Sequence, residues 1–298
     1  MELNLFCFIP LLLNKASTNE TEASISYFLA QALGSILLLI RITILFSLYW
    51  LKITIFYLII TAILLKIGAA PCHYWYPTSI EITRWINCLL LSTLQKIGPL
   101  FILLYTILPK IKNTIIILIA SINALIGGIM GLRQPSLKKI MAYSSITHIG
   151  WILRRSATNT PQIAVTYFLF YSIMALPVFI IFDKIKKLLI YELWARKAPS
   201  NKWITACSII LLSFGGLPPL TGFIPKLLII DTLIRCSKLM TIILVLGSLL
   251  NLFFYLNISL SIIIKNQKKS SPLKSTSSTI ITSFILTINL FPVTILLL

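Results

Sequence analysis

Apolar runs of about 20 residues recur from one end of this chain to the other, and this is the length that an α-helix needs to cross the hydrocarbon core of a bilayer. Of the 298 residues, 58% are hydrophobic and only 11% are charged. A transmembrane β-barrel would instead show alternating segments of about ten residues, and these are missing from the sequence. The sequence therefore predicts an all-α polytopic membrane protein whose core is formed by helices packed against helices.

Ten hydrophobic segments can be distinguished, and two of them are interrupted by glycine and proline. The third segment runs into GAAPCHYWYP at 68–77, and the eighth contains GGLPPLTG at 215–222. A break at membrane depth frees backbone polar groups that must be buried in protein or line a cavity. We therefore expect about ten transmembrane helices, two of them discontinuous, in two structurally related halves. The segments are 1–13, 24–46, 48–70, 86–108, 114–132, 140–153, 163–182, 203–234, 240–264 and 279–298.

Several functional classes are disfavoured by what the sequence contains. Its connections are too short to form a soluble domain for a nucleotide or a flavin, and no Ser/His/Asp set or phosphate-binding glycine loop is present. In a membrane protein, a net charge of +19 indicates membrane topology and contact with anionic lipids more often than it indicates binding to nucleic acid. The cysteines form no ligand cluster, so we expect no disulfide framework, iron–sulfur cluster or zinc site. They are Cys7, Cys72, Cys88, Cys207 and Cys236.

The most informative charges are three lysines that lie inside apolar segments, namely Lys66, Lys96 and Lys226. A charge at the bilayer centre costs about 2.5–3.5 kcal/mol even on the lenient insertion scale, so such lysines need partners or a hydrated path. Removal from water also disfavours the ammonium form, which allows a buried lysine to exchange a proton. The alternative is that their side chains reach out to the membrane surface. Glu2, Arg41 and Asp231 are further candidates.

Two single histidines, His73 and His148, can be interpreted in two ways. Each could cap a helix or hydrogen-bond within the core, and each could instead relay protons, because an imidazole both accepts and donates. We regard the structural role as the more frequent one for a lone histidine.

Six stretches resemble, in order and spacing, the NADH dehydrogenase subunit 2 family, the antiporter-like membrane subunits of mitochondrial respiratory complex I. The resemblance covers nearly the whole chain, and its third, fourth and sixth stretches contain Lys66, Lys96 and Lys226. The stretches are MELNLFCFIPLL, TEASISYFLAQALGS, LLKIGAAPCHYWYP, LQKIGPL, GGIMGLRQPSLKKIMAYSSITHIGW and SFGGLPPLTGFIPK.

The resemblance implies two inverted five-helix antiporter-like repeats, one over 1–153 with a broken helix near 66–77 and one over 154–298 with a broken helix near 215–222. The first half is N-terminally short compared with the family. By motif, Glu2 resembles the carboxylate that pairs with the broken-helix lysine, and Lys66 resembles that lysine. Lys96 resembles the central relay lysine, Lys226 the lysine of the second half, and His148 a linker between the halves.

The chain also departs from the family pattern at four positions. Leu94 stands where the family often has Trp, and Thr78 stands where it has an acidic residue. Arg154 and Arg155 follow a WIL motif where apolar or small residues are usual.

The function implied by the resemblance is proton translocation coupled to quinone reduction in other subunits of NADH:ubiquinone oxidoreductase. No cofactor is expected in this chain, since NADH, FMN, the iron–sulfur clusters and ubiquinone belong to other subunits. The expected partners are the other membrane-arm subunits, including neighbouring antiporter-like subunits, and lipids such as cardiolipin, and the expected location is the mitochondrial inner membrane. Two alternatives stay open: a stand-alone cation/proton antiporter, and a purely structural membrane subunit.

Overall fold

The computed structural model describes residues 2–13, 18–47, 52–107, 113–156, 161–185, 201–234 and 238–267, and all regular elements within these ranges are helical. The predicted last segment, 279–298, and Cys236 lie outside them. The helices are α1 (Glu2–Leu12), α2 (Thr18–Ser47), α3 (Lys52–Ile67), α4 (Trp75–Ile82), α5 (Trp85–Ser92), α6 (Leu94–Ile102), the π-helical turn η2 (Leu103–Ile107), α7 (Asn113–Leu132), α8 (Leu137–Ser156), α9 (Pro161–Ile185), α11 (Asn201–Gly215), α12 (Phe223–Ile234) and α13 (Lys238–Gln267).

Five stretches in the described part are long and apolar enough to cross a membrane, which confirms the predicted all-α membrane fold. They are Thr18–Ile40, Trp85–Tyr105, Ile115–Leu132, Pro161–Lys184 and Lys238–Ile263. The exact number of crossings and the division into two repeats stay predictions.

Two predicted segments differ in detail from the structure. Helix α2 begins at Thr18, six residues before the expected start, because the polar stretch before the apolar run is itself helical, with Glu20 in the first turn, where a negative charge is favourable. The predicted segment 86–108 is one span that is interrupted at Thr93 (φ −117°, ψ −77°). There the Thr93 hydroxyl donates to the Leu89 carbonyl at 2.7 Å, a bond that competes with regular helix geometry.

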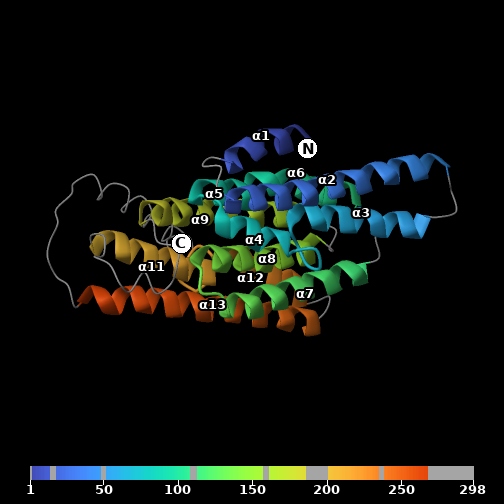
Figure 1. Cartoon of the computed structure of the whole chain (residues 1–298). Coiled ribbons are helices and arrows are strands. Elements are labelled where there is room, and N and C mark those ends of the chain that lie inside the picture. The colour runs from blue at the N-terminus through green and yellow to red at the C-terminus, as the bar shows by residue number, and fades with distance from the viewer. Residues whose placement is uncertain are drawn as a thin grey trace.

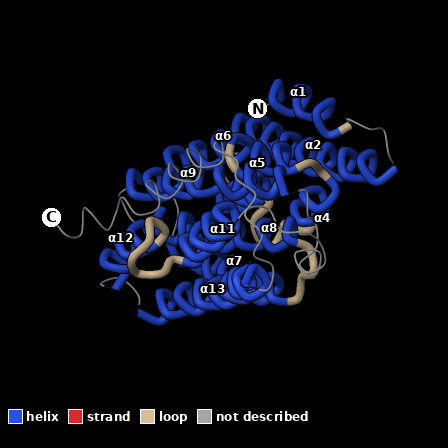
Figure 2. Tube along the Cα trace, turned by 90° about the vertical axis from the view of Figure 1, so that its left-hand side faces the viewer, coloured by secondary structure: helices blue, strands red, loops and turns tan. Residues whose placement is uncertain are grey.

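Helix α8 occupies the middle of the bundle. It packs against α4, α5, α7, α9, α12 and α13, and it lies between other helices in both views (Figures 1 and 2). Its sequence is polar for a membrane helix, and Ser144, Ser145, Thr147 and His148 are all buried. A helix of this composition cannot face lipid, so the protein places it where other helices cover every side.

The outer helices show the opposite pattern. Exposed leucine and isoleucine side chains follow one face of α2, α7, α9 and α13, as expected for surfaces that contact lipid tails. They include Leu29, Leu33, Ile36, Leu118, Ile122, Leu169, Ile173, Leu246 and Leu249.

The first turn of α8 is fixed to the corner between α4 and α5. The Lys138 ammonium group donates to the carbonyl oxygens of Glu81, at 3.1 Å, and of Thr83, which caps the C-terminal end of α4. Lys139 forms an ion pair with the Glu81 carboxylate at 2.6 Å. These contacts keep the far end of α4 in place against α8.

Candidate functional site

The first predicted break separates α3 from α4, and a Schellman motif ends α3. The amide of Ala69 donates to Leu64 O at 2.9 Å, and the amide of Gly68 donates to Leu65 O at 3.3 Å. Gly68 has φ +74°, the left-handed conformation that this motif requires and that glycine adopts without strain. Helix α3 therefore ends within the range 66–77 where the sequence predicted a break, and Gly68 is the first residue after it.

Side chains from two directions donate to carbonyl groups in the last turn of α3. The Trp75 indole N–H donates to Leu65 O at 2.9 Å, and the Gln31 amide of α2 donates to Lys66 O at 3.1 Å. Buried backbone groups without partners would cost several kcal/mol each in a bilayer. The break is thus stabilised by specific side-chain contacts.

Asn123 of α7 completes this set by pairing with the backbone of Ala70 in the loop. Its Oδ1 accepts from the Ala70 amide at 2.8 Å, and its Nδ2 donates to the Ala70 carbonyl at 3.3 Å and to Ile119 O at 2.8 Å. Asparagine suits this position because one side chain offers both a donor and an acceptor. The sequence analysis missed Asn123, since a single asparagine in an apolar run does not reveal its partner.

We expect Asn123→Leu to lower the stability of the assembled protein by about 2–4 kcal/mol, because two buried backbone groups would lose their partners. Asn123→Asp keeps the acceptor and loses the donor, so its effect should be intermediate. Thermal unfolding of the purified complex measures both variants. The control is Asn257→Leu, a change at an exposed position of α13, and equal melting temperatures for the leucine variants would contradict the assigned role.

Lys66 occupies the last turn of α3, directly before this break, and its side chain is 5% exposed. It lies against Gly34 of α2: a Cβ atom added there would be 2.6 Å from Lys66 Cγ and 3.0 Å from Cε. The structure therefore directs Lys66 into the bundle and contradicts the alternative in which it reaches the membrane surface. The side chain of Glu2 lies outside the described part, so the expected Glu2–Lys66 pair stays a prediction.

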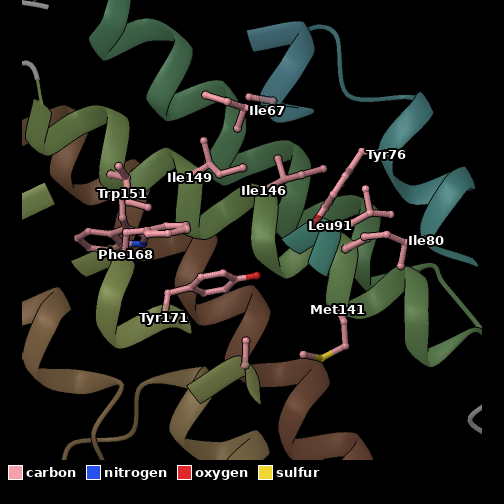
Figure 3. Close-up of a cluster of buried hydrophobic side chains, with 14 of the residues drawn as sticks. Ile67, Tyr76, Ile80, Leu91, Met141, Ile146, Ile149, Trp151, Phe168 and Tyr171 are labelled. Carbon is pink, nitrogen blue, oxygen red and sulfur yellow. The ribbon is translucent and has the colours of Figure 1, made fainter. Parts of the chain in front are cut away.

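Lys96 of α6 is the most enclosed of the three lysines, at 2% exposure. Its ammonium nitrogen lies 3.1 Å from Ser145 Oγ of α8 and 4.1 Å from the centroid of the Tyr76 ring. Ser145 Oγ and the Tyr76 hydroxyl are 2.9 Å apart. Figure 3 shows the hydroxyl groups of Tyr76 and Tyr171 pointing into the middle of the buried cluster.

The environment of Lys96 is thus made of hydroxyl groups and an aromatic face. Within the part of the chain whose side chains the structure describes, no carboxylate is bonded to Lys96 or to Lys226, and Glu81 is engaged by Lys139. A ring face attracts an ammonium ion, and Ser145 can accept from it while its own proton goes to Ala142 O at 2.7 Å. The Ser145 hydroxyl and the Tyr76 ring face are therefore the described groups that can stabilise the ammonium form of Lys96.

His148 follows Ser145 by one turn of α8 and is surrounded by aromatic side chains. Its Nδ1 is 2.8 Å from the Tyr167 hydroxyl, and its ring lies 5.1 Å from Tyr171 and 5.7 Å from Phe214 between centroids. It lies within electrostatic range of both Lys96 and Lys226. Its Nε2 is buried with no hydrogen-bond partner among the described residues.

The second predicted break separates α11 from α12 and repeats the geometry of the first. The amide of Leu217 donates to Leu212 O at 3.5 Å, and that of Gly216 donates to Ser213 O at 3.0 Å. This is again a Schellman motif, with Gly216 at φ +83°. In each case seven positions separate this glycine from the first residue of the next helix, Trp75 or Phe223. Figure 2 shows the second loop beside α12.

Lys226 bridges this second break. It belongs to α12, is 5% exposed, and donates from its ammonium group to the Gly215 carbonyl at the end of α11, at 2.8 Å. The C-terminal end of a helix carries about half a negative charge. Helix α11 therefore supplies electrostatic compensation to Lys226 through its backbone.

The remaining residues that the sequence singled out are a histidine, an aspartate and three arginines. His73 contacts Pro71 O through Nδ1 at 3.2 Å and stacks on Tyr74, which is a local contact in the first loop. Asp231 is exposed on α12, and the side chains of Arg41 and Arg155 lie outside the described part. Arg154 is buried within the bundle at 2% exposure, although the resemblance led us to expect an apolar or small residue there.

Three comparisons with known proteins show which of them this chain resembles. The family model for the transmembrane part of NADH:quinone oxidoreductase and Mrp antiporter subunits matches residues 1–251. NADH-ubiquinone oxidoreductase chain 2 of Lumbricus terrestris is 42% identical over 262 residues, which are 88% of this chain and 78% of the relative.

Solved structures share the fold at lower identity. A chain of respiratory complex I from Thermus thermophilus with bound aureothin superposes with a TM-score of 0.79 at 21% identity, over 96% of this chain and 71% of that chain. A chain of the Mrp complex from Dietzia sp. DQ12-45-1b gives 0.76 at 18% identity, over 91% and 56%. The chain therefore belongs to the NADH:quinone oxidoreductase/Mrp antiporter family, among the relatives named NADH-ubiquinone oxidoreductase chain 2.

Proposed function

We propose that this chain is a proton-translocating membrane subunit of NADH:ubiquinone oxidoreductase and that its buried lysines carry the proton path. The observation that supports this most strongly is the site of Lys96, whose fully enclosed ammonium group contacts a hydroxyl and a ring face. A buried ionisable group in a membrane is costly and marks an ion or proton pathway. Because the chain belongs to this family, we propose that the ion that moves along the pathway is a proton.

The proposed path runs from Lys66 through Lys96 and His148 to Lys226. Proximity of Glu2 favours the ammonium form of Lys66. When that pair separates, the loss of the carboxylate and the positive charge of Lys96 favour release of the proton toward the next site. The Ser145 hydroxyl lies beside Lys96, and the His148 imidazole lies within electrostatic range of both Lys96 and Lys226. Each of these two groups can accept one proton and donate another.

The energy for this path comes from elsewhere in the complex. Moving one charge across the membrane costs about 2.3 kcal/mol per 100 mV. We assign NADH, FMN, the iron–sulfur clusters and ubiquinone to other subunits of the complex. The proposed partners are neighbouring membrane-arm subunits and lipids such as cardiolipin, in the mitochondrial inner membrane.

The shared fold with the Mrp complex keeps a stand-alone cation/proton antiporter as the second candidate. The two functions differ in what drives the proton. An antiporter chain reconstituted alone in liposomes would acidify them in response to a cation gradient, whereas the proposed subunit would require NADH oxidation by the whole complex. Cation-driven exchange by the isolated chain would favour the antiporter.

The role of Lys66 is tested by Gly34→Ala in the assembled complex. The added methyl group would overlap Lys66 Cγ and force the lysine into another rotamer, at a cost of about 0.5–1.5 kcal/mol. We expect NADH-driven pumping to fall by up to about tenfold, while assembly on native gels stays normal. Ser35→Ala, one position further along α2, is the control and should pump normally, and equal pumping by both variants would contradict a role for the Lys66 geometry.

A further inference from the structure

Tyr76, in the first turn of α4, contacts the first break at one end of its side chain. A Cβ atom added to Gly68 would lie 2.8 Å from Tyr76 Cβ and 2.9 Å from its Cγ. The base of the tyrosine therefore packs directly against the glycine that ends α3, two residues after Lys66. Only the absence of a side chain at Gly68 allows this approach.

The other end of the same side chain contacts Lys96. The ring face lies 4.1 Å from the Lys96 ammonium nitrogen, and the hydroxyl is 2.9 Å from Ser145 Oγ, which in turn lies 3.1 Å from that nitrogen. Tyr76 is 1% exposed, so water does not compete with these contacts. A desolvated ring face attracts an ammonium ion more strongly than an exposed one.

The two ends of α4 are held differently, and this allows a change at the break to reach Tyr76. At its start, the Trp75 indole is bonded to Leu65 O of α3, so the first turn follows any movement of the end of α3. At its far end, Lys138 and Lys139 fix the helix to α8. A displacement of the break would therefore tilt the first turn of α4 and move the Tyr76 ring relative to Lys96.

We propose that Tyr76 is a positioning residue that couples the geometry of the first break, next to Lys66, to the charge on Lys96. The inference rests on the proposed roles of these two lysines in proton transfer. It adds a mechanical connection between them that uses only contacts present in this chain: Gly68 to the base of Tyr76, and the Tyr76 ring to Lys96.

The test measures NADH-driven proton pumping and electron transfer per assembled complex, in liposomes, for Tyr76→Phe and Tyr76→Leu. The phenylalanine variant keeps the ring and loses the hydroxyl, so we expect turnover within about fivefold of the parent, the effect of one hydrogen bond. The leucine variant loses the ring, and we expect coupled turnover to fall about thirtyfold. Tyr57→Leu, at an exposed tyrosine of α3, is the control and should behave as the parent.

A double variant separates positioning from a general loss of structure. If Tyr76 acts through Lys96, adding Tyr76→Leu to Lys96→Ala should not lower further the NADH:quinone electron-transfer rate that remains when the membrane is made permeable to protons. Parent-like coupled turnover in Tyr76→Leu, while Lys96→Ala loses pumping, would overturn this inference alone, whereas full pumping in Lys96→Ala would overturn the proposed function. If Tyr76→Leu does not assemble, Tyr76→Met replaces it. Failure of both variants beside a normal Tyr76→Phe would make the ring a folding element and overturn the inference.

Discussion

Replacing Lys96 with alanine should abolish NADH-driven proton pumping while the complex still assembles. The reason is the enclosure of its ammonium group, which contacts Ser145 and the Tyr76 ring and lies between the first break and His148. Among the described residues, no other lysine lies at this point of the proposed path and could replace Lys96 as its central proton carrier. Pumping and coupled electron transfer in liposomes, with assembly checked on native gels, provide the measurement.

Lys96→Arg distinguishes a carrier of protons from a carrier of fixed charge. Arginine keeps the positive charge and can still lie over the Tyr76 ring, but it does not release its proton in proteins. We therefore expect the arginine variant to assemble and also to lose pumping. Lys184→Ala, at an exposed position near the end of α9, is the matched control and should pump as the parent does.

Two outcomes would require the mechanism to be abandoned. Full pumping by Lys96→Ala would mean that Lys96 is structural and that the path avoids it. Full pumping by Lys96→Arg would mean that a permanent charge is enough, so that Lys96 tunes its neighbours without carrying the proton itself.

The sequence alone predicted the parts of this protein that depend on local composition. The apolar runs predict the spans, and the Gly/Pro clusters at 68–77 and 215–222 predict both breaks, because glycine readily adopts the positive φ that ends a helix and proline lacks the amide that would continue it. The positions of Lys66, Lys96 and Lys226 within apolar runs identified them as site candidates for the same reason.

The parts that the sequence did not predict depend on contacts between distant residues. Asn123 pairs with Ala70 across 53 positions, and Ser145 meets Tyr76 across 69. Each is an ordinary residue in its own segment, so nothing local indicates its partner. The polar composition of α8 was the available signal: a membrane helix this polar must be central, and its hydroxyl groups are therefore candidates for contact with any buried lysine.

Gly222→Ala should prevent the second break from forming and leave little assembled complex. Gly222 directly precedes α12, and a Cβ atom there would overlap the carbonyl oxygen of Ser213 in the last turn of α11. This neighbour is helical backbone, which cannot turn aside as a flexible side chain would. The cost should exceed the usual range of about 1–3 kcal/mol for overpacking. Native gels and thermal unfolding of whatever complex assembles measure it.

The control for this change lies at the other side of the same break. A Cβ atom at Gly215 would meet Leu252 of α13 at 3.4 Å, an ordinary contact, so Gly215→Ala should assemble well. Equal assembly of the two variants would contradict the close packing of α12 against the end of α11. That packing is what brings the Lys226 ammonium group to the Gly215 carbonyl. A complex that tolerated a methyl group at Gly222 would therefore need another source of compensation for the charge of Lys226, because the negative end of α11 would no longer lie within reach.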